Sequence, residues 1–397
     1  MTMQPDPVVI VSAARTPMGA FLGDFKEVTA AQLGAAAIRA TLERAGLATD
    51  AVDEVIMGCV LQAGQGQAPA RQAALGAGLA QGTVCSTVNK MCGSGMKAAM
   101  FGHDLLLAGS ANVVLAGGME SMSNAPYLLE RARSGYRMGH GRVLDHMFLD
   151  GLEDAYDKGR LMGTFAEDCA QAYGFSREQQ DAFAIASLTR AQQAMAEGRF
   201  AAEITAVEAR QGRELRRIDS DEQPPKARPE KIPTLKPAFR EGGSVTAANA
   251  SSISDGAAAL LLMRLSEAEK RGLTPLAAIR GHATFAQAPN LFATAPVGAL
   301  QRLMARSGWA LNQVDLFEIN EAFAVVPMAA MRDLDIPHDK LNVHGGACAL
   351  GHPIGASGAR LLVTLLSALQ QYDLKRGVAS LCIGGGEATA MAIELLN

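Results

Sequence analysis

The sequence consists of two similar halves, and this internal repeat constrains the fold more than any other feature. The same order of elements occurs twice: a helix, a glycine, a Val-Asp pair and a short strand. These elements lie at Ala36–Ala45, Gly46, Val52-Asp53 and Glu54–Met57, and again at Ala299–Ser307, Gly308, Val314-Asp315 and Leu316–Ile319. The offset is constant, because 308 − 46 and 314 − 52 both equal 262. Alternating strands and amphipathic helices are typical of a layered α/β unit, so two copies predict a pseudo-twofold axis.

Cys92 lies at a glycine-flanked turn directly before a predicted helix over residues 96–107. A thiol at a helix start is close to the positive end of the helix dipole and to free backbone N–H groups. Both favour the thiolate, which is the nucleophilic form of cysteine. The small residues Gly93, Ser94 and Gly95 leave space for an acyl carbonyl group to approach. The segment predicts a covalent acyl-transfer site, and a buried structural cysteine is the alternative.

Three polar residues far downstream provide partners for this cysteine. His352 lies in a loop before a predicted helix over residues 357–370, where an exposed imidazole is suited to take a proton from a thiol. Cys382 follows a short apolar strand and comes just before a run of three glycines, and Asn320 ends the repeated strand of the second half. The pseudo-twofold axis would bring Cys92 of one half close to His352 and Cys382 of the other.

The spacing of His344, Cys348 and His352, four residues apart, could also indicate a metal site. Three glycines within this span argue against the continuous helix that would place the side chains on one face. We therefore expect no metal ligands in the chain.

Four short segments, taken together and in this order, resemble the fingerprints of the thiolase family. They are Cys92-Gly93-Ser94, Asn320-Glu321-Ala322-Phe323, Gly351-His352-Pro353 and Cys382-Ile383-Gly384. The similarity extends over nearly the whole chain. It implies an α/β fold, a five-layer αβαβα sandwich of two duplicated halves with an inserted loop domain. The N-terminal half would span residues 1–120, completed by about 251–272, the loop domain 121–250, and the C-terminal half 273–397.

The resemblance implies the acetyl-CoA C-acetyltransferase reaction, a reversible Claisen condensation of two acetyl-CoA molecules to acetoacetyl-CoA and coenzyme A. Cys92 would carry the acyl group, His352 would accept the Cys92 proton, and Cys382 would remove the α-proton of the second substrate. The backbone N–H groups of Cys92 and Gly384 would bind one oxyanion, and His352 with a water held by Asn320 would bind the other. A broad-specificity 3-ketoacyl-CoA thiolase of β-oxidation is the alternative.

The same resemblance implies which residues hold coenzyme A, a substrate and product rather than a cofactor; no cofactor is expected. The positions that match the family's coenzyme A channel are Met162, Phe239, Ala247, Ser251, Ala322 and Phe323. Pro224 occupies the place where a potassium-activated subgroup carries a tyrosine, so we expect no potassium requirement.

The inserted segment has its own pattern. Ser176 and Gln179 form a capping-box signature for a helix over residues 177–197. Residues 208–240 contain five prolines and are expected to be irregular. They hold nine Lys or Arg residues against six Asp or Glu, a net charge of +3 that suits the phosphates of coenzyme A, although a solvated surface loop is an equal alternative.

Two other classes of function are less consistent with these motifs. A ketoacyl synthase uses Cys-His-His or Cys-His-Asn, and the second thiol of Cys382 argues against it. A non-catalytic acyl-CoA-binding relative should have lost a fingerprint residue, and none is lost. Residues 125–148 resemble the loop that joins thiolase dimers, so we expect a homotetramer built as a dimer of dimers.

Composition and charge indicate which partners and which cellular compartment to expect. The net charge of −4 argues against a nucleic-acid partner, which would need a broad basic face. No apolar run is long enough to span a membrane, and no signal peptide is expected before the first strand. Six cysteines without close pairing suit a reducing cytoplasm.

Overall fold

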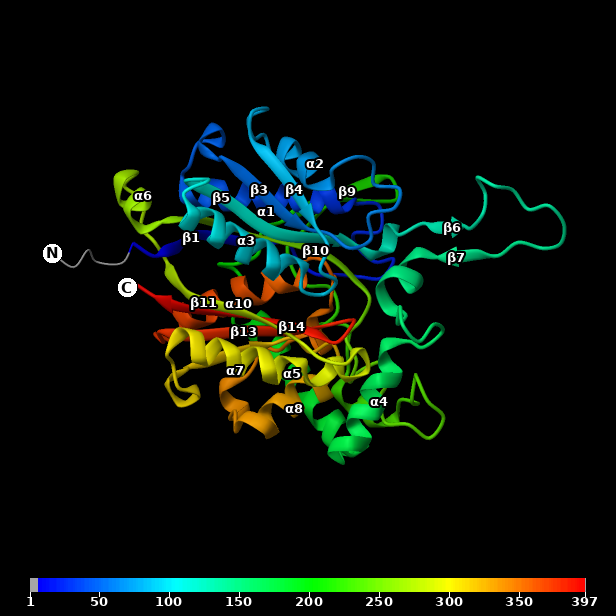
Figure 1. Ribbon diagram of the computed structural model, residues 1–397. Coiled ribbons are helices and arrows are strands. Elements are labelled where there is room, and N and C mark those ends of the chain that lie inside the picture. Colours follow the sequence, from blue (N-terminus) through cyan, green and yellow to red (C-terminus); the bar gives the residue numbers. More distant parts are fainter. Residues whose placement is uncertain (1–5, 397) are drawn as a thin grey trace.

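The two halves of the chain form two sheets with the same strand order (Figure 1). The computed structural model describes residues 6–396. In the first sheet the order is β4-β3-β5-β10-β1, with the short β2 (Gly19–Ala20) paired to β10, and in the second it is β12-β13-β14-β11, which within these residues lacks a counterpart of β4. The strands of the first are β1 (Val8–Arg15), β3 (Glu54–Gly58), β4 (Val84–Val88), β5 (Val113–Ser121) and β10 (Ser254–Arg264). Those of the second are β11 (Ala277–Ala286), β12 (Leu316–Ile319), β13 (Arg376–Ile383) and β14 (Glu387–Leu395).

The strand directions confirm the predicted duplication. β3 is parallel to β5, and β5, β10 and β1 then follow as antiparallel neighbours. β12, β13, β14 and β11 repeat this pattern in the same order. β3 and β12 begin at residues 54 and 316, so the offset of 262 found in the sequence holds in the fold. A short pairing of Val9 and Ile10 with β11 joins the two sheets at their edges.

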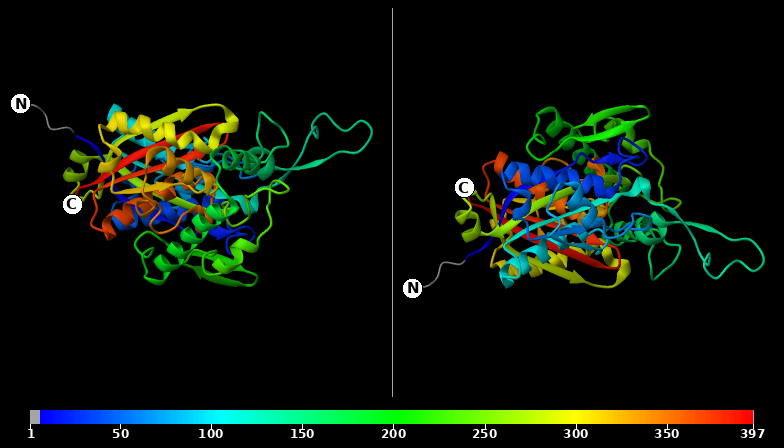
Figure 2. Two further views of the ribbon diagram at one scale, coloured as in Figure 1. Left: turned by 90° about the horizontal axis from the view of Figure 1, so that it is seen from below. Right: turned by 90° about the horizontal axis from the view of Figure 1, so that it is seen from above.

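Helices form three layers around and between the two sheets (Figures 1 and 2). α3 (Ser94–Ala108) and α10 (Ser357–Gln371) share one apolar core with strands of both sheets and form the central layer. The outer layer of the first half is α1 (Ala30–Ala45) and α2 (Pro69–Gly76). The outer layer of the second half is α7 (Ala295–Ser307) and α8 (Val325–Leu334). The expected five-layer αβαβα sandwich is therefore confirmed.

β10 illustrates why both faces of each sheet are apolar. Ala257, Leu261 and Met263 pack against the outer helices, whereas Ala258 and Leu260 pack against the central layer. A strand that is covered on both faces needs a continuous apolar run rather than an alternating one. Because β10 lies between β1 and β5, a strand from beyond the inserted segment completes the first sheet. The exact limits of the three predicted units remain a prediction.

Two equivalent glycines set the distance between the central helices. A Cβ atom on Gly95 of α3 would lie 2.8 Å from the backbone nitrogen of Ala359, and one on Gly358 of α10 would lie 2.5 Å from that of Met96. Such distances are shorter than any normal contact, so only glycine permits this approach. The contact places the starts of both helices, and the loops before them, side by side.

Several element boundaries differ from those predicted. α1 begins at Ala30 rather than Ala36, because Thr29 and Gln32 form a capping box that the apolar pattern did not indicate. α7 begins at Ala295, where Pro296 occupies the first turn. The capping box of Ser176 and Gln179 is confirmed at the start of α5 (Arg177–Ala196).

The prediction of a wholly irregular segment over residues 208–240 is wrong. β8 (Val207–Gln211) and β9 (Glu214–Ile218) form a hairpin with a two-residue turn in which Gly212 has a φ of 63°. Val207 and Ala209 are buried against the outer core of the first half, which stabilises the hairpin. The prolines all follow β9, where the chain forms turns and a 3₁₀ segment, Pro229–Thr234.

The inserted segment packs along one side of the two sheets, as both views of Figure 2 show. Its helices are α4 (Met162–Tyr173) and α5, and a second pair of strands, β6 (Tyr127–Leu129) and β7 (Val143–Asp145), carries a loop that projects from the body (Figure 1). The remaining short elements are β2 (Gly19–Ala20), α6 (Leu265–Lys270) and α9 (Ala347–Leu350). Among the described residues, no helix combines the length and apolar character needed to cross a membrane.

A buried ion cluster fastens the insert to the first half. The guanidinium of Arg15, at the end of β1, donates two hydrogen bonds to Asp221, at 2.7 and 2.9 Å, and one to Glu203 at 2.5 Å. All three side chains are inaccessible to solvent, or nearly so. Removing one partner would leave an uncompensated buried charge, so this cluster fixes the part of the insert around residues 203–221 against the first half.

Candidate active site

A cavity of about 340 Å³ lies where the two halves and the insert meet. Its walls are mostly apolar, and its polar groups come from segments far apart in the sequence. Of the residues predicted for the site, the cavity is lined by Cys92, Met162, Phe239, Ala247, Ser251, Ala322, Phe323, His352, Cys382 and Gly384. Asn320 does not line the cavity but lies directly behind His352. The fold therefore brings together every residue that the sequence assigned to acyl transfer and coenzyme A binding.

A larger hollow, about 800 Å³, lies between α1 and the β8–β9 hairpin. It is lined by residues such as Gln32, Arg39 and Glu208 and contains neither cysteine nor histidine. Because covalent acyl transfer needs a nucleophile and a base, we assign the chemistry to the smaller cavity.

Cys92 lies in the turn before α3, after Met91, whose φ of 48° is unusual for a residue with a side chain. The backbone N–H groups of Gly384 and of Cys92 itself lie near the Cys92 sulfur and act to lower its pKa. Burial has the larger effect and raises the pKa of Cys92 to about 11. Cys92 is therefore a thiol at rest and needs a base to remove its proton.

His352 is placed to be that base. Its Nδ1 lies 2.5 Å from the hydroxyl of Ser357, and this hydroxyl donates its own hydrogen to the carbonyl of Pro353 at 2.9 Å. Nδ1 must then carry the proton, which leaves the lone pair on Nε2. Burial, with a smaller contribution from Arg360, lowers the pKa of His352 to about 3. The prediction of an exposed imidazole is wrong, since His352 is only 6% accessible. The buried ring is neutral and able to accept a proton.

Asn320 directly follows β12 (Leu316–Ile319) and directs its amide at the same imidazole. The Nδ2 atom lies 3.4 Å from Nε2 and 3.5 Å from Nδ1 of His352. The next residue, Glu321, is fully buried and accepts hydrogen bonds from Ser187 at 2.6 Å and Asn342 at 2.8 Å. Asn320 is thus held on a rigid strand end by a carboxylate whose role the sequence did not reveal.

Cys382 is the penultimate residue of β13 and is 1% accessible. Burial, and next the proximity of Cys92, raises the pKa of Cys382 well above the usual value for a thiol. Cys382 is therefore a thiol at rest, and its thiolate would be a strong base once formed. Gly384, two residues later, supplies the N–H group that reaches the Cys92 sulfur.

The two predicted oxyanion donors lie near one atom. The N–H groups of Cys92 and Gly384 are both close to the Cys92 sulfur, the atom to which an acyl group would be bonded. Lys90, near Cys92, forms an ion pair with Glu387, which follows the glycine turn of Gly384. This pair links the nucleophile loop of one half to the donor turn of the other.

The apolar part of the cavity is a channel formed by the insert and the second half. The ring of Phe323 contacts those of Phe239 and Phe292 edge to face, with centroids 5.8 and 6.2 Å apart. Phe239 lies so close to Gly163 that a Cβ there would be 2.3 Å from the ring. The backbone N–H of Ser251 donates to the carbonyl of Ala322 at 2.9 Å, which joins the two segments that line the channel.

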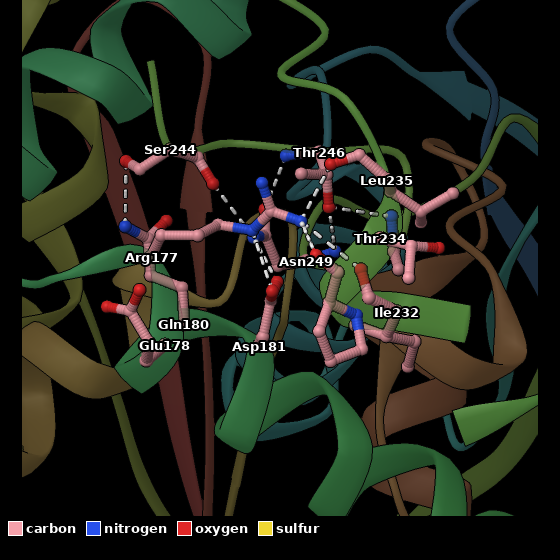
Figure 3. Close-up of polar contacts among 12 residues, drawn as sticks. Arg177, Glu178, Gln180, Asp181, Ile232, Thr234, Leu235, Ser244, Thr246 and Asn249 are labelled. Atoms are coloured by element: carbon pink, nitrogen blue, oxygen red, sulfur yellow. Dashed lines mark hydrogen bonds and ion pairs between the residues drawn. The ribbon is translucent and has the colours of Figure 1, made fainter. Parts of the chain in front are cut away.

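A polar network at the start of α5 holds this channel in place (Figure 3). Asp181 accepts a hydrogen bond from Arg177 at 2.7 Å and one from Asn249 at 3.0 Å. Arg177 also donates to the backbone carbonyls of Ile232 and Leu235, at 3.2 and 2.8 Å. The network therefore fixes both ends of the stretch that carries Phe239 and Ala247. The sequence indicated the helix start but not these long-range contacts.

His344 and Cys348 do not form a site with His352. The His344 ring contacts Phe200 and Tyr372, with centroids 5.9 and 5.6 Å apart. The Cys348 sulfur lies 3.7 Å from the carbonyl of Glu321. Both residues therefore pack around the loop before α9 rather than around the imidazole of His352.

Two thiols, a neutral imidazole and an amide around one apolar channel define an acyltransferase with a cysteine nucleophile. Residues 8–266 match the family model described as the thiolase N-terminal domain, and residues 273–395 match the thiolase C-terminal domain. The chain belongs to the thiolase family.

Known proteins resemble the chain over almost its whole length. It is 50% identical to the acetyl-CoA acetyltransferase of Escherichia coli, covering 98% of this chain and 99% of that protein. It is also 50% identical to the acetyl-CoA acetyltransferase of Pseudomonas aeruginosa, covering 97% of this chain and 98% of that one.

Solved structures agree. The crystal structure of the Bacillus anthracis acetyl-CoA acetyltransferase has a TM-score of 0.96 at 39% identity, covering 98% of this chain and 99% of that chain. A thiolase from Ascaris suum in complex with coenzyme A has a TM-score of 0.92, also at 39% identity, covering 98% and 100%.

Proposed function

We propose that the chain is an acetyl-CoA C-acetyltransferase, which condenses two acetyl-CoA molecules to acetoacetyl-CoA and coenzyme A. The observation that carries this proposal is the cavity in which Cys92, His352 and Cys382 meet beside the N–H group of Gly384. The names of the similar proteins favour it over a broad-specificity 3-ketoacyl-CoA thiolase of β-oxidation.

The first half-reaction transfers the acetyl group to Cys92. Nε2 of His352 takes the Cys92 proton as the sulfur attacks the thioester carbon. The N–H groups of Cys92 and Gly384 stabilise the oxyanion of the tetrahedral intermediate. When this intermediate collapses, the C–S bond to coenzyme A breaks, and Cys382 donates its proton to the leaving thiolate. The products are free coenzyme A, an acetylated Cys92 and a Cys382 thiolate.

The second half-reaction forms the carbon–carbon bond. The Cys382 thiolate removes an α-proton from a second acetyl-CoA, and the imidazolium of His352 together with Asn320 stabilises the enolate oxygen. The enolate carbon attacks the acetyl carbonyl, and the bond to the Cys92 sulfur breaks. Cys92 recovers its proton from His352, so every group returns to its starting state. The high pKa of Cys382 suits this order, because the group acts first as an acid and then as a strong base.

The phosphates of coenzyme A would contact the basic stretch beside the channel. Lys236 is exposed and shares a surface hollow with Phe239, which lines the cavity. Arg240 is already paired with Asp168, so Lys236 has the freer charge. We expect Lys236→Ala to raise KM for acetyl-CoA but not for a short pantetheine thioester, which lacks the nucleotide phosphates. Lys26→Ala, at another exposed lysine, is the matched control.

The experiment that tests the proposed activity measures kcat/KM for coenzyme A-dependent cleavage of 3-ketoacyl-CoA substrates of increasing chain length. We expect a sharp maximum at acetoacetyl-CoA. One methylene in an apolar pocket changes transition-state binding by only about 1–3 kcal/mol, so the profile has to be measured over several lengths. A flat or rising profile would instead assign the chain to β-oxidation.

The setting of the enzyme is also a proposal. We infer a cytoplasmic homotetramer, a dimer of dimers, that serves lipid metabolism and uses no cofactor besides coenzyme A as substrate and product. Its support is the projecting β6–β7 loop, which resembles the loop that joins thiolase dimers, and the balanced charge of the chain. Sedimentation velocity of the full chain tests the tetramer, and a dimer would contradict it.

A further inference from the structure

His103, Asp104 and His282 converge on one point at the side of the molecule away from the proposed chemistry. His103 and Asp104 belong to α3 of the first half, and His282 belongs to β11 of the second. Within residues 6–396, this is the group of potential metal ligands whose donor atoms all lie within 4.8 Å of one another. It takes no part in the proposed mechanism.

The distances fit a metal centre. Oδ1 of Asp104 lies 3.0 Å from Nδ1 of His103 and 2.9 Å from Nε2 of His282. Bonds of about 2.0–2.2 Å to a tetrahedral ion separate the ligand atoms by about 3.3 Å. The Asp104 oxygen would therefore need to move away from each of these nitrogens by only a few tenths of an ångström, and one donor atom of each of the three residues already lies within 4.8 Å of the others.

The orientation of the rings supports the same reading. The planes of His103 and His282 are 89° apart, with their centroids separated by 5.0 Å. Two perpendicular rings can direct nitrogen lone pairs at one point from different sides, which stacked rings cannot do. The side chain of Asp104 is 53% exposed, so water can reach a fourth coordination position.

A β-bulge in β11 brings His282 to this point. The pairing of β11 with β14 shifts by one residue between Ile279 and Gly281. Ile279 faces the central core and Ala283 the outer core, so Arg280 is the extra residue and His282 is returned to the side of α3. Without the bulge, alternation would put Gly281 on that side. Bulges of this kind commonly re-aim a functional side chain.

We propose that His103, Asp104 and His282 form a binding site for a divalent transition-metal ion of the zinc class, which links the central helix of the first half to the second sheet. Two imidazoles and one carboxylate suit Zn²⁺ and also Ni²⁺ or Cu²⁺. Lys97, seven residues before Asp104 on the same helix, opposes the cation, but its ammonium lies over the ring of Phe101, 4.4 Å from the centroid. This proposal departs from the expectation of no metal ligands. The sequence did not indicate the site, because His282 is 178 residues from Asp104 and only the fold brings the two together.

The test is calorimetric titration of the chelator-treated, untagged full chain with ZnCl₂, with the melting temperature measured with and without the ion. Asp104→Asn is the main variant, since it keeps the shape of the side chain and removes the charge. Loss of groups that only orient ligands reduces metal affinity about 10–100-fold, so we expect a loss of at least about tenfold for this direct ligand. Zn²⁺ should raise the melting temperature of the wild type but not of Asp104→Asn.

His282→Gln should behave as Asp104→Asn does, and His140→Ala, at an exposed histidine on the projecting loop, should bind like the wild type. Because Cys92 and Cys382 could bind Zn²⁺ themselves, the diagnostic quantity is the affinity that differs between wild type and Asp104→Asn. Equal affinity and equal thermal shift in these two proteins would overturn the proposal. Circular dichroism of each variant distinguishes loss of the site from loss of the fold.

Discussion

The two halves of the molecule share one backbone plan but place their chemistry at different positions. Gly58 ends β3 and Cys59 follows it, whereas the equivalent residues Asn320 and Glu321, at the offset of 262, follow β12. Glu54 of β3 pairs with Val114, and its counterpart Leu316 of β12 pairs with Gly377, so β5 and β13 are related by an offset of 377 − 114 = 263. At this offset, Met119 of β5 occupies the position that Cys382 has in β13.

The central helices show the same contrast. Gly95 and Gly358 are equivalent, at an offset of 263, and so Cys92 corresponds to Gly355. The hydroxyl of Ser94 donates to the carbonyl of Met91 at 2.6 Å, as Ser357 does to Pro353. Only in the second half does this serine also hold a histidine. In the proposed mechanism the first half thus supplies the nucleophile, the second supplies the base and the second thiol, and neither is complete alone.

The largest expected effect tests this division of labour. Cys92→Ser should lower turnover by at least about 10⁴-fold, because a serine hydroxyl is a much weaker nucleophile than a cysteine thiol and is harder for His352 to deprotonate. Steady-state rates of acetoacetyl-CoA cleavage provide the measurement, with Cys85→Ser as the control at a partly exposed cysteine of β4. Full activity in Cys92→Ser would remove the nucleophile from the first half.

The next effect tests whether the halves are equivalent where they touch. Gly95→Ala and Gly358→Ala should each lower the free energy of unfolding by about 2–3 kcal/mol, because each new methyl group meets backbone of the other helix. Gly82→Ala is the matched control, since a Cβ at that glycine meets nothing within 4 Å. Urea unfolding measures all three. A large loss in one variant and none in its mate would break the symmetry of the central layer.

Sensitivity to acid should originate in the second half. Burial lowers the pKa of His344 to about 4, whereas the ordinary value in an unfolded chain is about 6.5. Below about pH 6.5 the unfolded chain therefore binds a proton that the folded chain refuses, and stability falls with pH until about pH 4. Between pH 7 and pH 5 the wild type should lose about 2 kcal/mol more than His344→Asn.

Unfolding free energies at several pH values test this expectation. His140→Asn, at an exposed histidine of the projecting loop, should follow the wild-type curve. If His344→Asn followed it too, His344 would not be the source of the acid sensitivity.

The smallest effect concerns the insert, whose helices α4 and α5 serve the channel on the side of the second half. Asp181→Asn weakens the bonds to Arg177 and Asn249, so KM for coenzyme A should rise about tenfold with little change in kcat. Glu178→Gln is the matched control, because Glu178 is exposed and accepts from Ser176 instead. An equal rise in KM for both variants would show that the network does not position the channel.

The sequence alone predicted those structural features that depend on neighbouring residues or that occur in both halves. Ser176 and Gln179 predicted the start of α5, and the constant offset predicted two equivalent sheets. The β8–β9 hairpin could not be predicted from its own sequence, because it is stabilised by the burial of Val207 and Ala209 against the outer core of the first half. The protonation states of Cys92 and His352 were also out of reach, since burial, a property of the complete fold, outweighs the helix start and the loop position.

The most direct test of the account is mass spectrometry of the enzyme after brief exposure to acetyl-CoA, for wild type, Cys92→Ser and Cys382→Ser. The two thiols have different roles in the proposed mechanism, so acetylation and condensation should separate. We predict an acetyl group on Cys92 in the wild type and, formed more slowly because the leaving thiolate lacks its acid, in Cys382→Ser, with condensation lost in Cys382→Ser and no acetyl group in Cys92→Ser. An acetyl group on Cys382, or unchanged condensation without Cys382, would contradict the assignment of nucleophile and base to opposite halves.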